Sequence, residues 1–387
     1  MRDSLRGARV VLLTNFVAPY RLPLFRYLAS RLGTLKVFVS TEMEPNRSWP
    51  VDWGDLDVEV LHTWSVRETS RHPHAFDDPS FVYFPYDALT RLRRERPDVV
   101  VSGQLGVSSL LSAAHCLFRK RTKLVLWLTL SEISELGRGG FRRALRCRLL
   151  ARADAVMVNG ESGARYARSL GTPEQKIFRV YQAVEPSAFE GPHHRDTGST
   201  LRLLFVGSPE PRKGLGPFLE RLAARAVAHP ERKIALRVAG TNASDLESAL
   251  PELPTNLDVR WLGKVSYDQM PALYADADVL AFPTLADEWG LVANEALSAG
   301  LPVLGSVYSQ AVVELIEDGR TGWTFRPDDD SECRAALERV IATSPETLRA
   351  MGNACRERIA DFDIESVGER MLAAIAFARH DHSSDAI

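Results

Sequence analysis

Short apolar runs alternate with segments of helical periodicity along the first half of the chain. The runs are rich in β-branched residues and have the length of buried strands. The pattern predicts strands at 9–13, 36–40, 58–61, 99–102, 124–127, 155–158 and 177–180, with helices at 22–31, 86–95, 109–120, 140–151 and 162–169. Strands separated by helices of this length indicate a doubly wound parallel sheet.

The alternation is interrupted once and then starts again. Residues 185–200 are rich in Pro, Gly, His, Ser and Thr, as expected of an interdomain linker. The chain is also longer than one hydrophobic core usually supports. We therefore expect an α/β protein with two Rossmann-like domains, 1–187 and 188–363, facing a central cleft, with ligands at the carboxyl ends of the strands. The second half should contain strands 201–206, 234–239, 257–261 and 279–282 and helices 216–228, 243–250 and 267–275, and 364–387 should form a long helix with a polar tail.

Composition limits the class of protein. Hydrophobic residues make up 45% of the chain and charged residues 25%, which excludes global disorder. Residues 1–185 carry 28 Lys and Arg against 19 Asp and Glu, a balance of +9, and the remaining 20 basic and 31 acidic residues give −11. Halves of opposite charge indicate different partners for the two domains, or an attraction between them.

The cysteines and the apolar segments indicate the cell compartment in which the protein is found. Cys116, Cys147, Cys333 and Cys355 are widely spaced, which favours reduced thiols in a cytosolic protein over a metal or redox site. The apolar stretch near the N-terminus is too short for the core of a signal peptide. The uncharged window 99–118 contains Ser, Gly, Gln and His, so a membrane-spanning helix is not expected there. We expect a cytoplasmic protein.

The segment 278–306 carries the most informative chemistry. Its apolar strand stops at Pro283, a polar turn with two acids follows, and a helix begins at Gly290. Unpaired backbone N–H groups and the helix dipole point at such a turn and attract an anion. Carboxylates in the turn and in the helix, Asp287 and Glu295, can then hold the hydroxyl groups of a sugar or a ribose.

These residues resemble the retaining nucleotide-sugar glycosyltransferases of group 1, or family 4, which have the GT-B architecture. The resemblance covers most of the chain and is strongest over 201–326. It rests on two acids eight positions apart, Asp287 and Glu295, followed by Ala296, Gly300, Pro302 and Val303. It also rests on LLFVGSPEPRKGLGPFLERL at 203–222, VRWLGKVSYDQMPALYADADVLAFPT at 259–284, NFVAPYRLPLF at 15–25 and ADAVMVNGESGARYARSLG at 153–171. The architecture implies a C-terminal helix that returns toward the N-terminal domain.

The resemblance assigns roles in a donor site. Arg212 and Lys213 would neutralise the departing diphosphate, although a basic turn in solvent is the ordinary alternative. Asp287 would hold the transferred sugar, or else stabilise the helix dipole. Glu295 would bind the ribose hydroxyls, or else lie on a helix surface. The other donor-binding candidates are Gly207, the N–H groups of Gly290, Leu291 and Val292, and the loop Gly263, Lys264 and Val265, which is otherwise an ordinary strand-to-helix connection.

The chain departs from the family pattern at three places. The first signature acid is usually Glu and is Asp287 here, and Ser208 stands where many members have Arg. Leu128, Thr129 and Leu130 follow the strand after which many members have a His. On the acceptor side this leaves Tyr20, Arg21 and Glu132 as candidates.

Two other features are weaker. His72 and His74 are two lone imidazoles on an expected loop, and two such residues seldom bind a metal, so we expect no required metal and no cofactor beyond the donor. The basic segment 138–152 can lie on an anionic membrane at the inner face of the cell, or can bury its apolar side in the domain. A recognition motif for nucleic acid does not accompany the basic charge.

The expected function is transfer of a hexose-type sugar from a nucleotide-diphosphate donor to a hydroxyl acceptor, with retention of anomeric configuration. A lipid-linked or cell-surface glycan is the acceptor that the resemblance implies. A sugar-nucleotide epimerase or phosphorylase on the same scaffold is one alternative. A non-catalytic nucleotide-sugar-binding subunit is the other, because of Ser208 and the missing His.

Overall fold

The computed structural model describes residues 5–45, 51–74, 76–103, 105–137, 139–189, 200–242, 244 and 253–380. The chain divides into two compact units. Unit 1 comprises Met1–Ser70, Asp78–Ala183 and Ile364–Ile387, and unit 2 comprises Arg71–Asp77 and Val184–Asp363. The C-terminal segment is thus part of the N-terminal unit.

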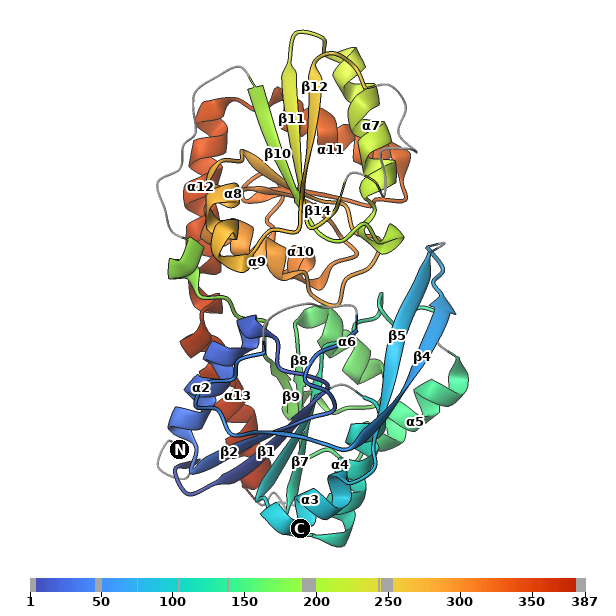
Figure 1. Ribbon diagram of the computed structural model, residues 1–387, viewed down its shortest axis with the longest axis vertical. Coiled ribbons are helices and arrows are strands. Elements are labelled where there is room, and N and C mark those ends of the chain that lie inside the picture. The colour runs from blue at the N-terminus through green and yellow to red at the C-terminus, as the bar shows by residue number, and fades with distance from the viewer. Residues whose placement is uncertain are drawn as a thin grey trace. The chain divides into compact units, whose positions relative to one another are not determined.

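Unit 1 is built on a seven-stranded parallel sheet with the order β3-β2-β1-β6-β7-β8-β9 (Figure 1). Its strands are β1 (Arg9–Thr14), β2 (Thr34–Val39), β3 (Val58–Val60), β6 (Val99–Gly103), β7 (Lys123–Leu128), β8 (Ala155–Val158) and β9 (Ile177–Arg179). Between them lie α2 (Leu22–Arg31), α3 (Ala88–Glu95), α4 (Val107–Phe118), α5 (Gly140–Leu150) and α6 (Glu161–Ser169).

Both faces of this sheet are buried, which explains the nearly continuous apolar runs of its strands. Alternate residues of one strand enter different cores, as the two-residue period of a strand requires. Val10 and Leu12 pack with α2 and the C-terminal helix, whereas Val11 and Leu13 pack with α3. The core further along the same sheet contains residues of α4, α5 and α6.

A two-stranded sheet in the first half was not predicted. It consists of β4 (Thr63–Arg71) and β5 (Asp77–Pro85). Most residues of β4 are exposed. The sequence therefore lacks the alternation of buried and exposed positions that reveals a strand.

Unit 2 contains a six-stranded parallel sheet with the order β12-β11-β10-β13-β14-β15. The chain passes from β10 (Thr200–Val206) through β11 (Lys233–Ala239) to the edge strand β12 (Leu257–Gly263), and then returns to the other side of β10. There it forms β13 (Val279–Phe282), β14 (Val303–Ser306) and β15 (Gly322–Phe325). The direction of winding reverses between β10 and β13, and such a switch point is where open α/β sheets bind ligands.

The helices of unit 2 follow the strands in turn. They are α7 (Leu215–Ala228), α8 (Met270–Ala275), α9 (Leu291–Ser298), α10 (Gln310–Leu315), α11 (Asp330–Ala342) and α12 (Pro345–Ile359). Phe218 and Leu222 of α7 and Leu337 of α11 share a core with the sheet residues Phe205 and Leu304.

The last helix, α13 (Ile364–Arg379), packs into unit 1. Val367, Met371 and Ile375 belong to the same core as β1 and α2. The hydroxyl of Tyr27 on α2 donates to Oε1 of Glu369 at 2.8 Å, and Gly368 lies against the Tyr27 ring. The expected return of the C-terminal helix is confirmed.

Three expectations fall wholly or partly on residues that are not described. Within the linker 185–200, residues 190–199 lie outside the described residues, as do 243 and 245–250 of the expected helix 243–250 and the tail residues 381–387. None of the described helices is both long enough and apolar enough to cross a membrane.

Candidate active site

The candidate donor residues gather in unit 2 at the carboxyl ends of β10 and β13. After β10 the chain turns through Gly207 into a short 3-10 helix, Pro211–Lys213, and then enters α7. After β13 it runs from Pro283 to Gly290 and enters α9. Because β10 and β13 are adjacent and parallel, both loops leave the same edge of the sheet at the switch point.

Backbone contacts hold the basic turn against the loop after β13. The carbonyl oxygen of Arg212 accepts from the N–H of Leu285 at 2.8 Å and from Oγ1 of Thr284 at 3.1 Å. The Arg212 guanidinium donates to the carbonyl oxygen of Ala286 at 3.0 Å and to the Glu210 carboxylate at 3.1 Å. The guanidinium is thus fixed in orientation before any ligand binds.

Lys213 and Asp287 form the central ion pair of the site. Nζ of Lys213 lies 2.7 Å from Oδ2 of Asp287, and Nη1 of Arg212 lies 3.6 Å from the same oxygen. The side chains of Lys213 and Asp287 are only 17% and 14% exposed, so water screens the pair weakly. The interpretation of 212–213 as a basic turn in solvent therefore does not hold.

Burial and charge act in opposite directions on both groups. Burial lowers the pKa of Lys213, and Arg212 lowers it further, against the attraction of Asp287. Burial alone would raise the pKa of Asp287, but the charges of Lys213 and Arg212 outweigh it and the pKa lies below its ordinary value. Asp287 is therefore ionised near neutral pH, and the site contains two cations and one anion at its centre.

The rest of the loop is fixed by its neighbours. The Asp287 carboxylate accepts from the backbone N–H of Trp289 at 3.3 Å. The Asp287 N–H donates to the carbonyl oxygen of Tyr308 at 3.1 Å. The Trp289 indole N–H donates to Asn294 on α9 at 2.7 Å, and the carbonyl oxygen of Glu288 accepts from Gln310. The backbone of Glu288 and the side chain of Trp289 thus hold the loop in place.

Gly290 begins α9 in a conformation that suits glycine alone. Its φ is +101°, in the left-handed region, and a β-carbon there would lie 2.6 Å from the Phe282 ring and 2.9 Å from Oγ of Ser309. Gly290 also has no side chain that could cap the first N–H groups of the helix. The amides of Gly290, Leu291 and Val292 are therefore suited to bind an anion.

Glu295 is buried in α9 and bonded to a residue that the sequence did not single out. The hydroxyl of Tyr274 on α8 donates to Oε2 of Glu295 at 2.6 Å. Glu295 is 7% exposed and Tyr274 is fully buried, with Phe189 packed edge-on against the tyrosine ring. Burial raises the pKa of Glu295 to about 7, although the hydrogen bond from Tyr274 opposes this. The alternative of a surface glutamate does not hold.

The remaining donor candidates lie at the carboxyl ends of β10 and β12. The carbonyl oxygen of Gly207 accepts from Oγ1 of Thr241 at 2.9 Å, and the Gly207 N–H donates to Ala239. Gly263 has a φ of +64°, and its carbonyl oxygen accepts from Gly240 at 2.7 Å. Lys264 is exposed and Val265 is half-buried in the loop that follows. These contacts connect the carboxyl ends of β10, β11 and β12.

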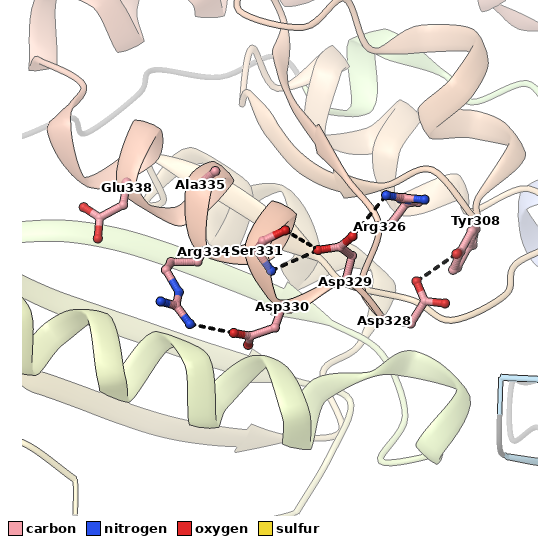
Figure 2. Close-up of a pocket in the computed structure, with 9 residues that line it drawn as sticks. All are labelled: Tyr308, Arg326, Asp328, Asp329, Asp330, Ser331, Arg334, Ala335 and Glu338. Carbon is pink, nitrogen blue, oxygen red and sulfur yellow. Dashed lines mark hydrogen bonds and ion pairs between the residues drawn. The ribbon is translucent and has the colours of Figure 1, made fainter.

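A surface pocket of about 710 Å³ lies at the carboxyl end of β15 and the start of α11. Figure 2 shows three contacts among its side chains: Arg326 pairs with Asp329, Arg334 with Asp330, and the Tyr308 hydroxyl donates to Asp328 at 2.8 Å. Glu338 pairs with Arg225 and His229. Asp329 also caps α11 through the N–H groups of Ser331 and Glu332. The acids of this pocket thus have structural partners.

Comparison with known proteins identifies the family. Residues 200–343 match the family model of glycosyl transferases group 1, and residues 6–182 match that of the glycosyl transferase 4-like domain. The chain belongs to the group 1 glycosyltransferases.

Curated relatives of this group 1 chain carry glycosyltransferase names. Sulfoquinovosyl transferase SQD2 of Arabidopsis thaliana is 28% identical over 242 residues, which are 59% of this chain and 46% of the relative. D-inositol 3-phosphate glycosyltransferase of Streptomyces scabiei is 30% identical over 252 residues, 59% of this chain and 55% of the relative. The chain thus spans about half the length of the curated relatives it matches.

Solved structures show the same fold. HepE of Anabaena in complex with UDP is 17% identical, with a TM-score of 0.69 over 95% of this chain and 99% of that chain. Sucrose-phosphate synthase of Thermosynechococcus elongatus is 18% identical, with a TM-score of 0.68 over 96% of this chain and all of that chain (100%). The expectation of two parallel-sheet α/β domains of the GT-B type is confirmed.

The acceptor candidates of this group 1 chain lie in unit 1. Tyr20 and Arg21 form a short 3-10 helix, Pro19–Arg21, between β1 and α2. The Arg21 guanidinium lies 5.0 Å from the ring centroid of Trp127 and 6.0 Å from that of Tyr20. Glu132 is 42% exposed and pairs with Arg165 at 3.0 Å, so its carboxylate has a structural partner.

The weaker candidates also lie in defined places. His72 and His74 are in the turn between β4 and β5, with ring centroids 4.9 Å apart. A search of the described residues finds no group of three or more side chains that could hold a metal ion.

The basic helix α5 buries Leu149 and Leu150 in a core of unit 1, which agrees with the second expectation for 138–152. Some of its arginines also make contacts within the unit. Arg146 is buried in unit 1, where it pairs with Glu135 and donates to the Tyr166 hydroxyl at 2.7 Å. Arg142 pairs with Glu68, and Arg143 donates to the carbonyl oxygen of Ser169. Three of the arginines thus serve contacts within the unit, because a guanidinium can satisfy a buried carboxylate as well as face water. Arg138 lies outside the described residues.

Proposed function

We propose that this chain transfers a sugar from a nucleotide-diphosphate donor to a hydroxyl group, with retention of anomeric configuration. The observation that carries the proposal is the cluster of Arg212, Lys213 and Asp287 at the switch point, next to the uncapped start of α9. Two cations and a helix N-terminus facing one edge suit a diphosphate, because negative charge accumulates on the leaving group as the glycosidic bond breaks. HepE, which shares the fold, was solved with UDP and with UDP-glucose, and this supports a nucleotide sugar as the donor.

Each part of the donor would bind different charged groups of the site. The diphosphate takes Arg212, Lys213 and the N–H groups of 290–292. Asp287, released from the cations, accepts hydrogen bonds from hydroxyls of the transferred sugar. Glu295 accepts two hydrogen bonds from the ribose diol, for which a carboxylate has the required pair of oxygens. Gly207 and the loop 263–265 would lie beside the nucleoside.

The acceptor would attack from the face that the diphosphate leaves. The C–O bond to the leaving phosphate breaks while the acceptor oxygen bonds to the same anomeric carbon. The acceptor proton passes to the departing phosphate oxygen, so the chain need not provide a nucleophile or a metal ion. We assign donor binding to the domain 188–363 and acceptor binding to the domain 1–187.

The acceptor is proposed to be a lipid-linked or cell-surface glycan, used at the inner face of the membrane. Phe141 on α5 is 86% exposed and Phe118 at the end of α4 is 72% exposed, with Arg119 and Lys120 next to Phe118. Exposed aromatic and basic side chains together suit an anionic bilayer. Flotation with anionic and with neutral vesicles at low salt tests this, and failure to bind the anionic vesicles excludes it.

The function is tested by incubating the purified chain with UDP-, GDP- and dTDP-sugars and measuring nucleotide release, with and without EDTA. Sugar transfer with the anomeric configuration of the donor, read by NMR, supports the proposal. An isomerised sugar identifies an epimerase, and release that depends on inorganic phosphate identifies a phosphorylase. A donor-dependent rise in Tm without turnover identifies a binding subunit. Lys213→Met removes a cation of the proposed donor site, so this variant is the control that shows whether the nucleotide is released at this site.

A further inference from the structure

Arg21 lies at the switch point of the sheet in unit 1. The sheet winds outward from β1 through β2 to β3, and on the other side from β6 to β9. The short helix that contains Arg21 directly follows β1, at the carboxyl edge where an open α/β sheet takes a ligand. The guanidinium lies over Trp127 near the carboxyl end of β7.

The charge of Arg21 is not balanced within the described part of the chain. Among the described residues, no carboxylate lies within 4.0 Å of its guanidinium, and its buried Nε has no hydrogen-bond partner. The indole N–H of Trp127, which is 1% exposed, also lacks a partner in the part of the chain that the structure describes. Arg146, a buried arginine of the same unit, also has a buried Nε without a partner among the described residues, but its charge is paired with Glu135.

An unpaired and partly buried guanidinium is unfavourable in the free protein. A cation–π contact offsets only part of the cost of leaving a buried donor unsatisfied. A bidentate oxyanion removes this cost, because its two oxygens match the planar fork of the guanidinium. Sites that break the usual rules of pairing are commonly sites of function.

The neighbouring polar groups that the structure describes at this edge are amides and one acid, Glu44. Asn159, which is fully buried, donates to the carbonyl oxygen of Thr129 at 3.2 Å and accepts from Gln182 at 2.9 Å. Glu44 is engaged by Asn15 at 3.4 Å. The Arg21 guanidinium therefore provides a positive charge beside neutral amides, which suits an anionic and hydroxylated ligand.

We propose that Arg21 receives an oxyanion, a phosphate or a carboxylate, carried by the sugar acceptor. Naming the ligand as the acceptor rests on the proposed transferase function, whereas the anion site itself does not. Trp127 supports the guanidinium from below and holds it toward the edge of the sheet. The acceptor is then a sugar phosphate or a uronic acid rather than a neutral glycan.

The test uses the full chain with ¹⁵N-labelled tryptophan, and follows the indole signal of Trp127, which the Trp127→Phe variant identifies. Glucose 6-phosphate, glucuronate and glucose are titrated in parallel. We expect a saturable shift with one or both anions and none with glucose; a response to the phosphate alone identifies a phosphorylated acceptor, and to glucuronate alone a uronic acid. Arg21→Gln should weaken the anion about tenfold to a hundredfold.

Two further variants make the outcome decisive. Arg21→Lys keeps the charge without the fork and should bind more weakly than wild type but better than Arg21→Gln. Arg26→Gln, on the exposed side of α2, should respond as wild type does. An equal shift with glucose, no shift with either anion, or an undiminished shift in Arg21→Gln overturns the proposal. Nucleotide release measured on the same samples shows separately whether the transferase function holds.

Discussion

The Lys213 ammonium lies 2.7 Å from the Asp287 carboxylate, although 74 positions separate the two residues along the chain. The pair joins the loops after β10 and β13 at the switch point of the sheet. In the absence of donor, Asp287 provides the negative charge that the proposed site would otherwise take from a diphosphate. A donor must therefore compete with a carboxylate that is already in place.

Replacing Lys213 with Met should chiefly lower the rate of transfer. In the proposed reaction the cation faces the charge that develops on the leaving group, and removing one such group commonly costs about 10²–10³ in kcat. Steady-state kinetics with the donor identified by the screen measure the effect. Lys233→Met, an exposed lysine at the start of β11, is the matched control. Equal rates for Lys213→Met and wild type would contradict the assigned role.

Asp287→Asn should bind the nucleoside diphosphate product more tightly while transferring sugar more slowly. The neutral amide no longer competes for Lys213 and Arg212, and a gain of about 1.4 kcal/mol corresponds to tenfold in Kd. Calorimetric titration measures the affinity. Glu210→Gln is the control, because Glu210 is 41% exposed and its pair with Arg212 should contribute little. Weaker product binding in Asp287→Asn would show that the carboxylate does not compete.

Donor affinity should rise with pH around neutrality. The pKa of Glu295 is raised to about 7, and its ionised form offers the ribose one more acceptor than the protonated form. Glu295→Gln should make the profile flat and weaken the donor throughout. Tyr274→Phe should move the midpoint upward, because the tyrosine hydrogen bond lowers the pKa of Glu295. Tyr267→Phe should not move it; an unchanged midpoint in Tyr274→Phe would exclude the positioning role of Tyr274.

The same carboxyl should reduce stability at high pH. Its pKa in the folded chain, about 7, lies above the ordinary value of 4.5, so the folded state binds more protons and stability falls as the pH rises between these values. A shift of this size corresponds to about 3 kcal/mol. Glu295→Gln should therefore unfold at higher denaturant concentration than wild type at pH 8, and show little difference at pH 4.5. If the stability of wild type and of Glu295→Gln changed with pH in the same way, burial of Glu295 would not be the cause.

Gly290→Ala should weaken donor binding and lower stability by roughly 1–3 kcal/mol. The added β-carbon meets the Phe282 ring and Ser309 and takes up a φ of +101°, which displaces the start of α9. Gly216→Ala is the control, since a β-carbon there has no neighbour within 4 Å and φ is not in the left-handed region. Denaturant unfolding and donor titration measure both effects. Similar results for the two variants would remove the argument for a conformational requirement at Gly290.

Unit 1 should lose stability as the pH falls below about 6.5. Burial lowers the pKa of His115, aided by Arg119 and Arg93, and both ring nitrogens lack partners in the described structure. The unfolded chain then binds the proton more readily, so acid favours unfolding. His115→Leu should flatten this dependence, and His380→Leu, at an exposed position after α13, should not. Unfolding curves between pH 5 and pH 8 provide the measurement.

Periodicity predicts the parts of the fold whose residues are buried in a regular pattern. The predicted strands have one or both faces buried in a core. Helix α9 was predicted from Gly290 at its start and from the spacing of its apolar residues. The β4–β5 hairpin was missed because most of β4 faces solvent, so selection for burial leaves no trace in its sequence. A strand held by backbone pairing alone is hard to find from one sequence.

The candidate site was predictable as a set of residues but not as a set of contacts. The acids and the basic turn follow from local patterns, whereas the pairing of Lys213 with Asp287 depends on which strands are neighbours. Tyr274 occupies an apolar position in α8, and its hydroxyl gains a partner only through packing against α9. Arg146 looked like a surface arginine because its partner Glu135 lies in the preceding loop, and helical periodicity carries no information about such a pair.

The placement of α13 has a consequence for synthesis on the ribosome. The core around β1 and α2 includes Val367, Met371 and Ile375, which emerge after all of unit 2 has been made. One apolar face of the nascent sheet in unit 1 therefore stays uncovered while unit 2 is synthesised and folds. A chaperone that shields apolar surface would therefore be needed most before residue 364 leaves the exit tunnel, and least once the final helix has docked.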